Sequence, residues 1–595
     1  MFTTSSVFLK SLADAGITHA FANWGSDHPA LLEDLQRQRS EGDGNTAPKI
    51  ITCPNEMVAL TAAQGYAQVT GKPAAVIVHV DVGTQVRHGG AIHNVDRGRV
   101  PVLIYAGASP FSSLGELKGG RNEWIMSVQD IPDQAAIVRQ YMRFTSQIES
   151  GKVAAQVIHR ALQVATSYPK GPVYLWARRE VMEEEVAASA LESTVNARKW
   201  PPIEPAALSL TAASAIALAL LEASSPLIVT SHSGRNPKAV RLLADLSSAL
   251  CIPIVAVCPS AVAVPFSHPY FLGVTYLNGG THTPRLAKAD VILVLDSDAP
   301  HPDARVFIID SGDPLKTISA VGQWHIDAEM MCNADVVLAL EAITQAAVGA
   351  KQNDSLIEQR KTELATEHGE WIRTLNRLED AWTAGGRATV PNVLGVLRRS
   401  IERQTPSRSL QRTLVLNEGI TNYPLVWEHM RAEVAGGQLT AGGASLGWGL
   451  AAAVGAHMGG KGHELIVSVV GDGSFMFGVP SSAYWIARKY DTPFLTIVLN
   501  NGGWRAPKMS MLGCHPTGHG SRASGVELSV GFGPHCPDYS QIAVAASAGW
   551  VWGKRAGGDS DKSAKEDLES VIGEAVRIVL EERRCAVVDC VLDSI

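Results

Sequence analysis

The feature that most constrains this chain is the regular alternation of short apolar runs with longer amphipathic stretches along its 595 residues. Runs such as AAVIVHV at 74–80 and ADVILVLDSD at 289–298 are rich in β-branched residues. Nearly continuous apolar strands are typical of parallel sheets that helices cover on both faces. The pattern therefore predicts an α/β protein built from doubly wound parallel sheets.

The alternation falls into three blocks of similar size, which predicts three domains. The first block covers 1–185 and the second covers 207–348. The stretch 186–206 lies between them, is irregular and contains WPPIEP, so it resembles a linker. The third block covers 389–595, and the charged segment 349–388 before it predicts a connecting helical excursion.

Composition narrows the kinds of partner. A net charge of −7 gives no basic footprint for nucleic acid. There is no run of about 18 uncharged apolar residues for a membrane span, and the N-terminus lacks the pattern of a signal peptide. Eight scattered cysteines form no CxxC pair, which favours a reducing, cytoplasmic location. The cysteines and histidines within 514–536 leave a zinc site open as an alternative.

Polar residues follow two apolar runs of the third block. GDG at 471–473 and NN at 500–501 stand where two predicted strands end, with one predicted helix between them. Ligands of open α/β sheets bind at this carboxyl edge of the strands. Asp472 and an asparagine amide oxygen are hard donors suited to a magnesium ion that also holds phosphate oxygens, and the Ser474 hydroxyl and a helix N-terminus can receive phosphate. The spacing predicts a metal-bridged diphosphate site, whereas GDG alone would equally fit an ordinary turn.

The stretch 471–504 resembles the cofactor motif of thiamine diphosphate enzymes, which bind their cofactor through magnesium. The resemblance implies three metal ligands: Asp472, the Asn501 side chain and the Gly503 carbonyl. It implies that Gly473 and Ser474 touch the diphosphate.

Two further segments of the third block share this resemblance. NEGITN at 417–422 resembles the second diphosphate-binding loop, which would place three of its residues near the phosphates: Gly419, Thr421 and Asn422. The segment 440–456 resembles the pyrimidine-binding turn and helix. There the Leu446 side chain would bend the cofactor, and the backbones of Ala444 and Leu446 would meet the aminopyrimidine.

In the first block, the segment 53–74 resembles the one that carries the activating glutamate of these enzymes, which here would be Glu56. The alternative is an exposed glutamate in the first turn of a helix, favoured by the helix dipole. In the family arrangement, the carboxyl bonds the pyrimidine ring, so that the bent cofactor can place its own base beside the reacting carbon.

Other side chains of the first block are expected to face the reacting carbon and to choose the reaction. His28 follows the first strand, His79 follows another, and Gln129 matches a glutamine that the family keeps near the cofactor. Each histidine could instead be a capping or surface residue; near its ordinary pKa, a neutral histidine can bond a substrate carbonyl oxygen. From the third block, Trp504 and the loop 505–523 are expected to cover the site.

The motifs occur in the order expected of the family, and the chain resembles the branch that contains acetohydroxyacid (acetolactate) synthases, 2-hydroxyacyl-CoA lyases and cyclohexanedione hydrolases. The resemblance implies an acetolactate synthase-like carboligase or lyase that uses thiamine diphosphate and Mg²⁺ on a small-molecule 2-oxo acid or 1,2-dione. It also implies a homodimer or homotetramer with active sites between subunits, in which Glu56 of one chain reaches cofactor held by another.

Several alternatives stay open on the same scaffold. The chain could be a 2-oxo acid decarboxylase, a C–C hydrolase or a flavin-dependent oxidase. TSHSGRN at 230–236 contains a glycine turn before a helix, which could accept a nucleotide such as FAD. A catalytically silent family member is a further alternative, although Glu56, Asp472 and Asn501 are all present.

Overall fold

The structure is a computed structural model and describes residues 2–192, 197–276, 284–297, 304–312, 327–350, 353–382, 386–460, 462–533, 535–557 and 563–595. The chain divides into two compact units. Unit 1 consists of Met1–Glu204 and Ala441–Lys461, and unit 2 consists of Pro205–Thr440 and Gly462–Ile595. A short segment of the third predicted block thus folds with the first block.

Unit 1 is built on a six-stranded sheet in which all neighbouring strands are parallel. In spatial order the strands are β3 (Lys49–Thr52), β2 (His19–Ala22), β4 (Ala74–Val78), β5 (Val102–Ala108), β7 (Val173–Arg178) and β6 (Phe144–Gln147). One face of this sheet shares a core with α1 (Thr4–Asp14), α2 (Pro29–Glu41) and α6 (Ala154–Thr166). The helices α3 (Glu56–Thr70) and α5 (Val86–Arg97) cover the other face. A short antiparallel pair, β1 (Phe2–Thr3) with β8 (Glu185–Val186), was not predicted.

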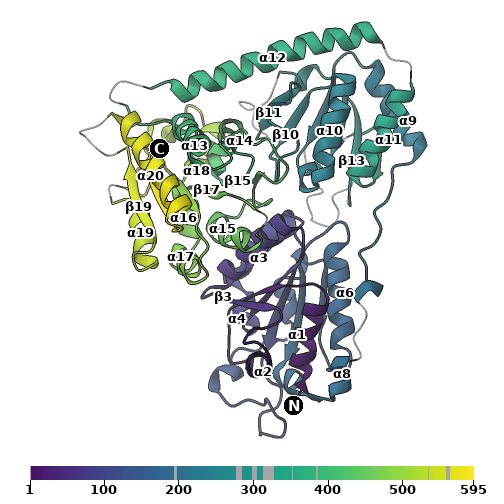
Figure 1. Cartoon of the computed structure of the whole chain (residues 1–595), viewed down its shortest axis with the longest axis vertical. Coiled ribbons are helices and arrows are strands. Elements are labelled where there is room, and N and C mark those ends of the chain that lie inside the picture. The colour runs from purple at the N-terminus through teal and green to yellow at the C-terminus, as the bar shows by residue number, and fades with distance from the viewer. Residues whose placement is uncertain are drawn as a thin grey trace. The chain divides into compact units, whose positions relative to one another are not determined.

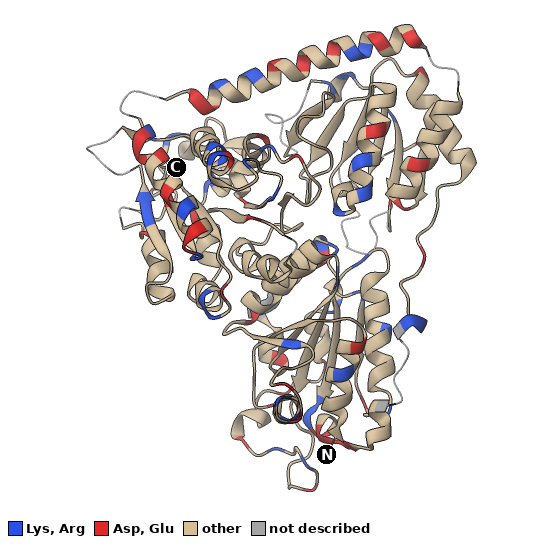
Figure 2. Ribbon diagram, viewed as in Figure 1, with Lys and Arg blue, Asp and Glu red and all other residues tan. Residues whose placement is uncertain are grey.

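The helix α15 (Gly449–Met458) from late in the chain packs closely on α3 in unit 1. A Cβ on Gly65 would overlap the backbone of Ala452, and a Cβ on Gly455 would overlap the backbone of Ala62. These two contacts show that the helices run antiparallel with almost no side chain between them. The glycines are therefore required by the close approach, and α15, which has no Lys, Arg, Asp or Glu, is drawn in tan in Figure 2.

Unit 2 contains two more six-stranded sheets, each with all neighbours parallel. The second sheet has the order β11 (Phe271–Thr275), β10 (Ile254–Val257), β9 (Pro226–Thr230), β12 (Val291–Leu295), β13 (Arg305–Asp310) and β14 (Met330–Asn333). The third sheet has the order β16 (Gln438–Leu439), β15 (Thr413–Glu418), β17 (Leu465–Gly471), β18 (Leu495–Asn500), β20 (Ala586–Val591) and β19 (Trp552–Ala556). Three doubly wound parallel sheets confirm the predicted fold class.

The first and third sheets share one strand order, and the second has a different order, but each sheet contains a point where the order reverses. The chain fills one side of a central strand, returns and then continues on the other side, so the strand order reverses between β2 and β4, between β9 and β12, and between β15 and β17. Open α/β sheets bind ligands beside such reversal points, at the carboxyl ends of the strands. The topology therefore marks three candidate edges, one in each sheet.

The predicted connecting helix is α12 (Asp354–Asp380), the long helix at the top of Figure 1. Figure 2 shows Lys or Arg and Asp or Glu spread along its whole length. Its last turn is anchored by Glu379, which is 1% exposed and lies 2.6 Å from Arg398 and 2.8 Å from Arg431. These arginines lie on or beside helices of the third sheet's block, so the ion pairs fix the end of α12 there.

The block of the third sheet also contains the long helix α20 (Ala564–Glu581), which precedes β20. The strand predicted over 74–80 ends at Val78, so His79 lies beyond it. The loop predicted over 505–523 contains a helix, α18 (Arg505–Cys514), and a 3-10 turn, η9 (His519–Arg522).

Two properties of the described residues concern membranes and metal ions. Within the described ranges, no helix is both long enough and apolar enough to cross a membrane. Across the same residues, no group of three or more His, Cys, Asp or Glu side chains is arranged to hold a metal ion, so the zinc alternative finds no support.

Candidate active site

The edge of the third sheet holds Asp472 in a fixed orientation. Asp472 follows β17, opens the short helix α16 (Asp472–Phe477) and is 3% exposed. Its Oδ1 accepts the backbone N–H of Gly473 at 2.7 Å, and its Oδ2 accepts that of Gly503 at 2.9 Å. Burial raises the pKa of Asp472 to about 6, against the lowering effect of these N–H donors. The carboxylate is thus oriented by the backbone, and no side-chain cation pairs with it among the described residues.

The two asparagines after β18 have different surroundings. The Asn500 amide donates to Asp589 Oδ1 at 2.8 Å, and its Oδ1 accepts the N–H of Gly502 at 3.1 Å. Asn501 is 7% exposed, and its side-chain oxygen has no hydrogen-bond partner within the described part of the chain. A buried amide oxygen without a partner costs about 1–3 kcal/mol, which a bound cation would offset.

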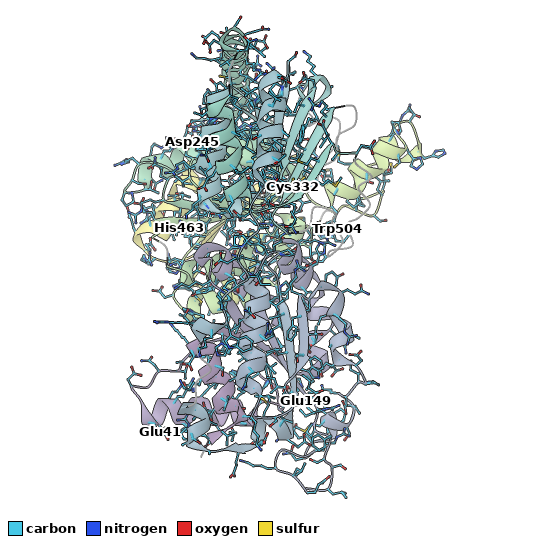
Figure 3. The ribbon with its side chains drawn as sticks, turned by 90° about the vertical axis from the view of Figure 1, so that its right-hand side faces the viewer. Glu41, Glu149, Asp245, Cys332, His463 and Trp504 are labelled. Carbon is cyan, nitrogen blue, oxygen red and sulfur yellow. The ribbon has the colours of Figure 1, made fainter. Side chains whose placement is uncertain are left out.

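Trp504 borders this edge. Its ring lies so near Gly473 that a Cβ there would come within 2.9 Å of it, and its backbone N–H donates to Val530 at 2.9 Å. The ring packs edge-on against Phe532 at 5.3 Å between centroids. Figure 3 labels Trp504 in unit 2, and the residue remains 42% exposed. The structure therefore places an aromatic wall beside the glycine turn.

The loop after β15 joins the same edge. The Ser474 hydroxyl donates to the Glu418 carbonyl at 3.3 Å, which links the loops after β17 and β15. Gly419 donates to Asn417 Oδ1 at 3.1 Å and accepts from the Asn422 N–H at 2.7 Å. The 3-10 turn η8 (Ile420–Asn422), which includes the predicted Thr421, contacts α18. All predicted diphosphate-loop and metal residues thus stand along one sheet edge.

These residues fit a magnesium-bound diphosphate. An oriented carboxylate and an unpartnered amide oxygen are the hard donors that Mg²⁺ takes. The absence of a Cβ at residue 473 lets the Trp504 indole lie directly against the glycine turn. The donor chemistry supports the metal assignment independently of any sequence resemblance.

The edge of the first sheet carries a hydrogen-bonded chain of side chains. His79 Nδ1 lies 2.5 Å from Asp27 Oδ1, and its Nε2 lies 2.9 Å from Gln129 Oε1. Burial acts to lower the pKa of His79, but the hydrogen bond and charge of Asp27, together with Gln129 and Asp81, outweigh it and raise that pKa. The structure therefore brings the predicted His79 and Gln129 together, but with His79 favoured as imidazolium rather than neutral.

His28 lies behind this chain. It is 1% exposed, and its Nε2 is 3.3 Å from Asp27 Oδ2. Its Nδ1 accepts the Gly25 N–H at 3.1 Å, and the ring packs near Trp24 and Tyr105. Burial lowers the pKa of His28 and outweighs the nearby carboxylate, so this ring is neutral. The structure gives His28 a buried, supporting position beside Asp27.

Glu56 lies inside unit 1 and is not an exposed helix-start residue. It is the first residue of α3 and is 5% exposed. The helix cap is supplied by its neighbour, since Asn55 Oδ1 accepts the N–H groups of Met57 and Val58 at 3.0 and 3.3 Å. A Cβ on Gly83 would come within 3.6 Å of Glu56 Oε1, which shows how closely the segment after β4 approaches the carboxyl.

The predicted pyrimidine-binding turn is also held in unit 1. The Asn94 side chain donates to the Ser445 carbonyl at 2.8 Å and accepts the Ser445 N–H at 3.1 Å. On either side of Ser445 are Ala444, which is exposed, and Leu446, which is half-buried. The clamp fixes the backbone of this turn while it leaves both neighbours accessible.

Sequence reasoning missed Asp27 and Asn94. Asp27 stands beside His28 in the segment after β2, but its partner His79 is 52 positions away. Asn94 and Ser445 are 351 positions apart. Only the strand order brings such residues together, although the acidic neighbour of His28 was a visible signal for Asp27.

At the carboxyl edge of the second sheet, polar side chains hydrogen-bond to one another. Ser231 pairs with Ser297 at 2.7 Å, and His232 pairs with Ser260 at 2.9 Å. Asp296 accepts both the N–H and the hydroxyl of Ser311, at 2.7 and 3.0 Å. Part of the acidic stretch after β12, at 298–303, lies outside the described residues. In the described part of this edge these polar groups bond to one another, and no feature there supports FAD.

Comparison with known proteins agrees with this geometry. The model of the thiamine pyrophosphate enzyme N-terminal TPP binding domain matches residues 2–137, and that of the C-terminal TPP binding domain matches 419–590. Together the two matches cover just over half of the chain. The chain belongs to the thiamine pyrophosphate enzymes.

Several curated relatives span most of the chain. The benzoylformate decarboxylase of Pseudomonas aeruginosa is 24% identical over 517 residues, 85% of this chain and 87% of the relative. The acetolactate synthase of Bacillus subtilis is 22% identical over 507 residues, 84% and 81% of the two chains. The 2-hydroxyacyl-CoA lyase of Arabidopsis thaliana is 23% identical over 621 residues, 98% and 94%.

Solved structures show the same fold. The thiamine diphosphate-dependent 4-hydroxybenzoylformate decarboxylase of Rhodococcus jostii RHA1 superposes with a TM-score of 0.75 at 20% identity, covering 100% of this chain and 99% of that one. The benzoylformate decarboxylase of Polynucleobacter necessarius gives 0.74 at 16% identity, with the same coverage. The chain is a thiamine diphosphate-dependent enzyme of the acetolactate synthase/decarboxylase family, whose members form or break carbon–carbon bonds.

Proposed function

We propose that this enzyme cleaves the carbon–carbon bond beside the carbonyl of a 2-oxo acid and releases CO₂. The relatives include decarboxylases and acetolactate synthases, and loss of CO₂ from a 2-oxo acid is a step that both kinds of reaction can share. The observation that carries the proposal is the Asp27–His79–Gln129 chain, because it supplies a protonated imidazole beside the first sheet's edge. Decarboxylation to an aldehyde is the first candidate.

The third sheet's edge would hold the cofactor's diphosphate. In this proposal Asp472, Asn501 and the Gly503 carbonyl bind Mg²⁺. The residues around the phosphates are Gly419, Thr421, Asn422, Gly473 and Ser474, with Trp504 beside them. Ala444 and Leu446 meet the pyrimidine, and Glu56 bonds its ring nitrogen. When bound, thiamine diphosphate supplies the nucleophilic carbon and the electron sink.

The proton balance gives His79 its role. A 2-oxo acid anion that loses CO₂ must take up one proton to leave as an aldehyde. With Nδ1–H bonded to Asp27, the imidazolium can give the Nε2 proton to the product carbon or its oxygen and recover it from water. Gln129 accepts from Nε2–H in the resting protein and would orient it.

An acetolactate synthase-like carboligase is the second candidate. The acetolactate synthase of Bacillus subtilis, whose alignment covers 84% of this chain, supports this candidate. In that reaction the acyl group passes to a second carbonyl and the proton goes to the new alkoxide oxygen. The same His79 Nε2 proton serves both outcomes, so the two candidates differ in the acceptor and not in the residues already named.

The proposed assembly is a homodimer or homotetramer with shared active sites. In unit 1, Gly65 is level with Ala452 in the antiparallel pair α3 and α15. At 1.5 Å per residue, Glu56 is then roughly 18 Å along the axis from the start of α15. Leu446 precedes that start, so Glu56 and Leu446 of one chain stand too far apart to meet one pyrimidine. This separation supports a site that takes Glu56 from one chain and Leu446 from another.

Carbon-13 NMR of the purified protein with thiamine diphosphate, Mg²⁺ and labelled 2-oxo acids tests the proposal. Pyruvate and benzoylformate sample aliphatic and aromatic acids, and a 1,2-dione samples the alternative substrate class. Release of labelled CO₂ with an aldehyde supports the decarboxylase, and acetolactate supports the carboligase. Turnover of the dione without turnover of any 2-oxo acid would overturn the proposal.

A further inference from the structure

We propose that Asp27 is a positioning residue that holds the His79 imidazole by its Nδ1 and acts as the counter-ion of a His79 imidazolium. The inference deepens the proposed function, since it concerns the proton donor of the same site. Neither the composition nor the motifs pointed to Asp27.

The Asp27 carboxylate contacts both the ring of His79 and the backbone of the next residue. Asp27 is 3% exposed, and its Oδ1 makes the 2.5 Å contact with His79 Nδ1. Its Oδ2 accepts the Val80 N–H at 3.2 Å, from the residue directly after His79. One carboxylate therefore fixes both the ring and the backbone beside it. A buried charge of this kind persists only where a partner compensates for its lost hydration.

The backbone is shaped around this pair. A Cβ on Gly25 would overlap the His79 ring, and a Cβ on Gly107 would overlap the Asp27 carboxylate. Val80 has a φ of 33°, a left-handed conformation that is rare for a β-branched residue. Such strain persists where surrounding contacts enforce it, and here it turns the Val80 N–H toward Asp27.

The charges facing His79 favour the imidazolium. From the segment after β2 come Asp27 and the neutral His28, and from the helix α4 (Val80–Thr84) comes Asp81, which also raises the pKa of His79. From the loop after β5 comes Gln129, which is uncharged and accepts from Nε2. Tyr105 on β5 has its pKa raised well above the ordinary value by burial and stays neutral.

Next to Gln129, the Asp130 carboxylate is 2.9 Å from Arg121 and 2.8 Å from Arg178. These arginines are bonded to Asp130 rather than to the His79 chain. Burial alone would raise the pKa of Asp27, but the His79 imidazolium and the Val80 N–H lower it. Asp27 therefore stays ionised across the neutral range, and the proton resides on His79.

Carbethoxylation of histidines in the full-length protein, followed by peptide mass spectrometry, measures the protonation of His79. Only neutral imidazole reacts, so the midpoint of rate against pH gives the pKa, whatever the exposure of the ring. In the wild type we expect a midpoint for His79 above 6.5. His19 and His93 are internal references, because burial lowers the pKa of each.

The variant Asp27→Asn removes the counter-ion and keeps the shape. At pH 7 it should raise the His79 modification rate about threefold or more, because burial alone favours the neutral ring. Asp34→Asn is the matched control. That carboxylate is 4% exposed in the same unit and bonds Ser6 and Arg37 instead, so the His79 midpoint should not move.

A wild-type midpoint at or below that of His93 would overturn the proposal, and this measurement needs no variant that could fail to fold. An unchanged midpoint in folded Asp27→Asn would overturn it as well. The alkaline limb of kcat/KM is a second readout and should move to lower pH in Asp27→Asn by about one unit. If the midpoint shifts but no 2-oxo acid is turned over, the proposed function fails and the assignment of Asp27 stands.

Discussion

The second and third sheets differ in strand order, but each places a buried aspartate directly after a strand beside its reversal point, and the surroundings of the two aspartates differ. Asp296 follows β12 and Asp472 follows β17, each beside the reversal of its sheet. Asp296 is bonded by the backbone and hydroxyl of Ser311, so it ties two strand ends of its own sheet together. Within the described ranges, Asp472 accepts only from backbone N–H groups, and it stands near the Asn501 side-chain oxygen, which has no partner there.

The difference teaches how a ligand edge can be recognised within one architecture. Every sheet has a carboxyl edge beside its reversal point, but the side chains at that edge determine whether its polar groups are free to bind a ligand. Where polar groups satisfy one another, as at Asp296, the edge is structural. Where buried oxygens are oriented and left without donors, as at Asp472 and Asn501, the edge is built for a cation.

The largest expected effect separates these two aspartates. Asp472→Ala should weaken thiamine diphosphate binding by about 1,000-fold, because the diphosphate loses an anionic metal ligand. Asp296→Ala should leave the affinity within about threefold and instead lower stability by about 1–3 kcal/mol. Titration calorimetry at fixed Mg²⁺ and urea unfolding measure both quantities. Equal loss of cofactor binding in both variants would show that the distinction between the edges is not real.

The second effect concerns Glu56. Glu56→Gln should bind thiamine diphosphate but slow proton–deuterium exchange at its reacting carbon by about 100-fold or more, since the amide cannot carry the proton. Exchange is followed by NMR after acid quench. Glu180→Gln is the control, because that carboxylate is also buried in unit 1 but bonds the Ser112 N–H and hydroxyl. Wild-type exchange in Glu56→Gln would mean that another group activates the cofactor.

A smaller effect divides the adjacent asparagines. Asn501→Ala should raise the Mg²⁺ concentration needed for half-maximal cofactor binding by about 10–100-fold. Asn500→Ala should change it by less than about threefold, while stability falls by about 1–3 kcal/mol because Asp589 loses a donor. Mg²⁺ titrations of cofactor binding compare the two. The reverse order of effects would reassign the metal ligand.

The smallest effect is a pH dependence at the first sheet's edge. Because the pKa of His79 is raised, the stabilisation that the His79 imidazolium provides is present below about pH 6.5 and is lost as pH rises through the raised pKa. The lowered pKa of Asp27 means that its contribution is present above about 3.8 and lost as pH falls through the lowered value. His79→Gln should therefore cost about 1–2 kcal/mol near pH 5.5 and less at pH 9, as measured by urea unfolding. A cost that grows toward pH 9 would contradict the ion pair.

Much of the fold could be predicted because it rests on local patterns. Apolar runs such as 74–80 give the strands, and the glycine turn before Asp472 gives the carboxyl edge. The end of strand β4 at Val78, one residue before His79, could not be predicted, since the sequence runs on through His79 to the apolar Val80 without a break. The left-handed backbone of Val80 accompanies its N–H contact with Asp27, a residue 53 positions away that the local sequence does not contain.

The candidate site was predictable where motif residues are close in sequence and less so elsewhere. The fold now gives a physical reason to choose Asn501 over Asn500, because Asp589, 89 positions away, takes the Asn500 amide. His28 was expected to face the reacting carbon, and the structure buries it behind Asp27. The roles of all these residues, and the boundaries of the three domains, stay predictions.

The position of the bound metal ion tests most directly whether Asp472 and Asn501 hold the cofactor. Mn²⁺ can replace Mg²⁺, and anomalous diffraction from crystals grown with Mn²⁺ and thiamine diphosphate would show its position. We predict one ion per chain, about 2.0–2.3 Å from oxygens of Asp472 and Asn501 and in contact with the diphosphate. An ion bound at Asp296, or a diphosphate held away from Asp472, would contradict the account.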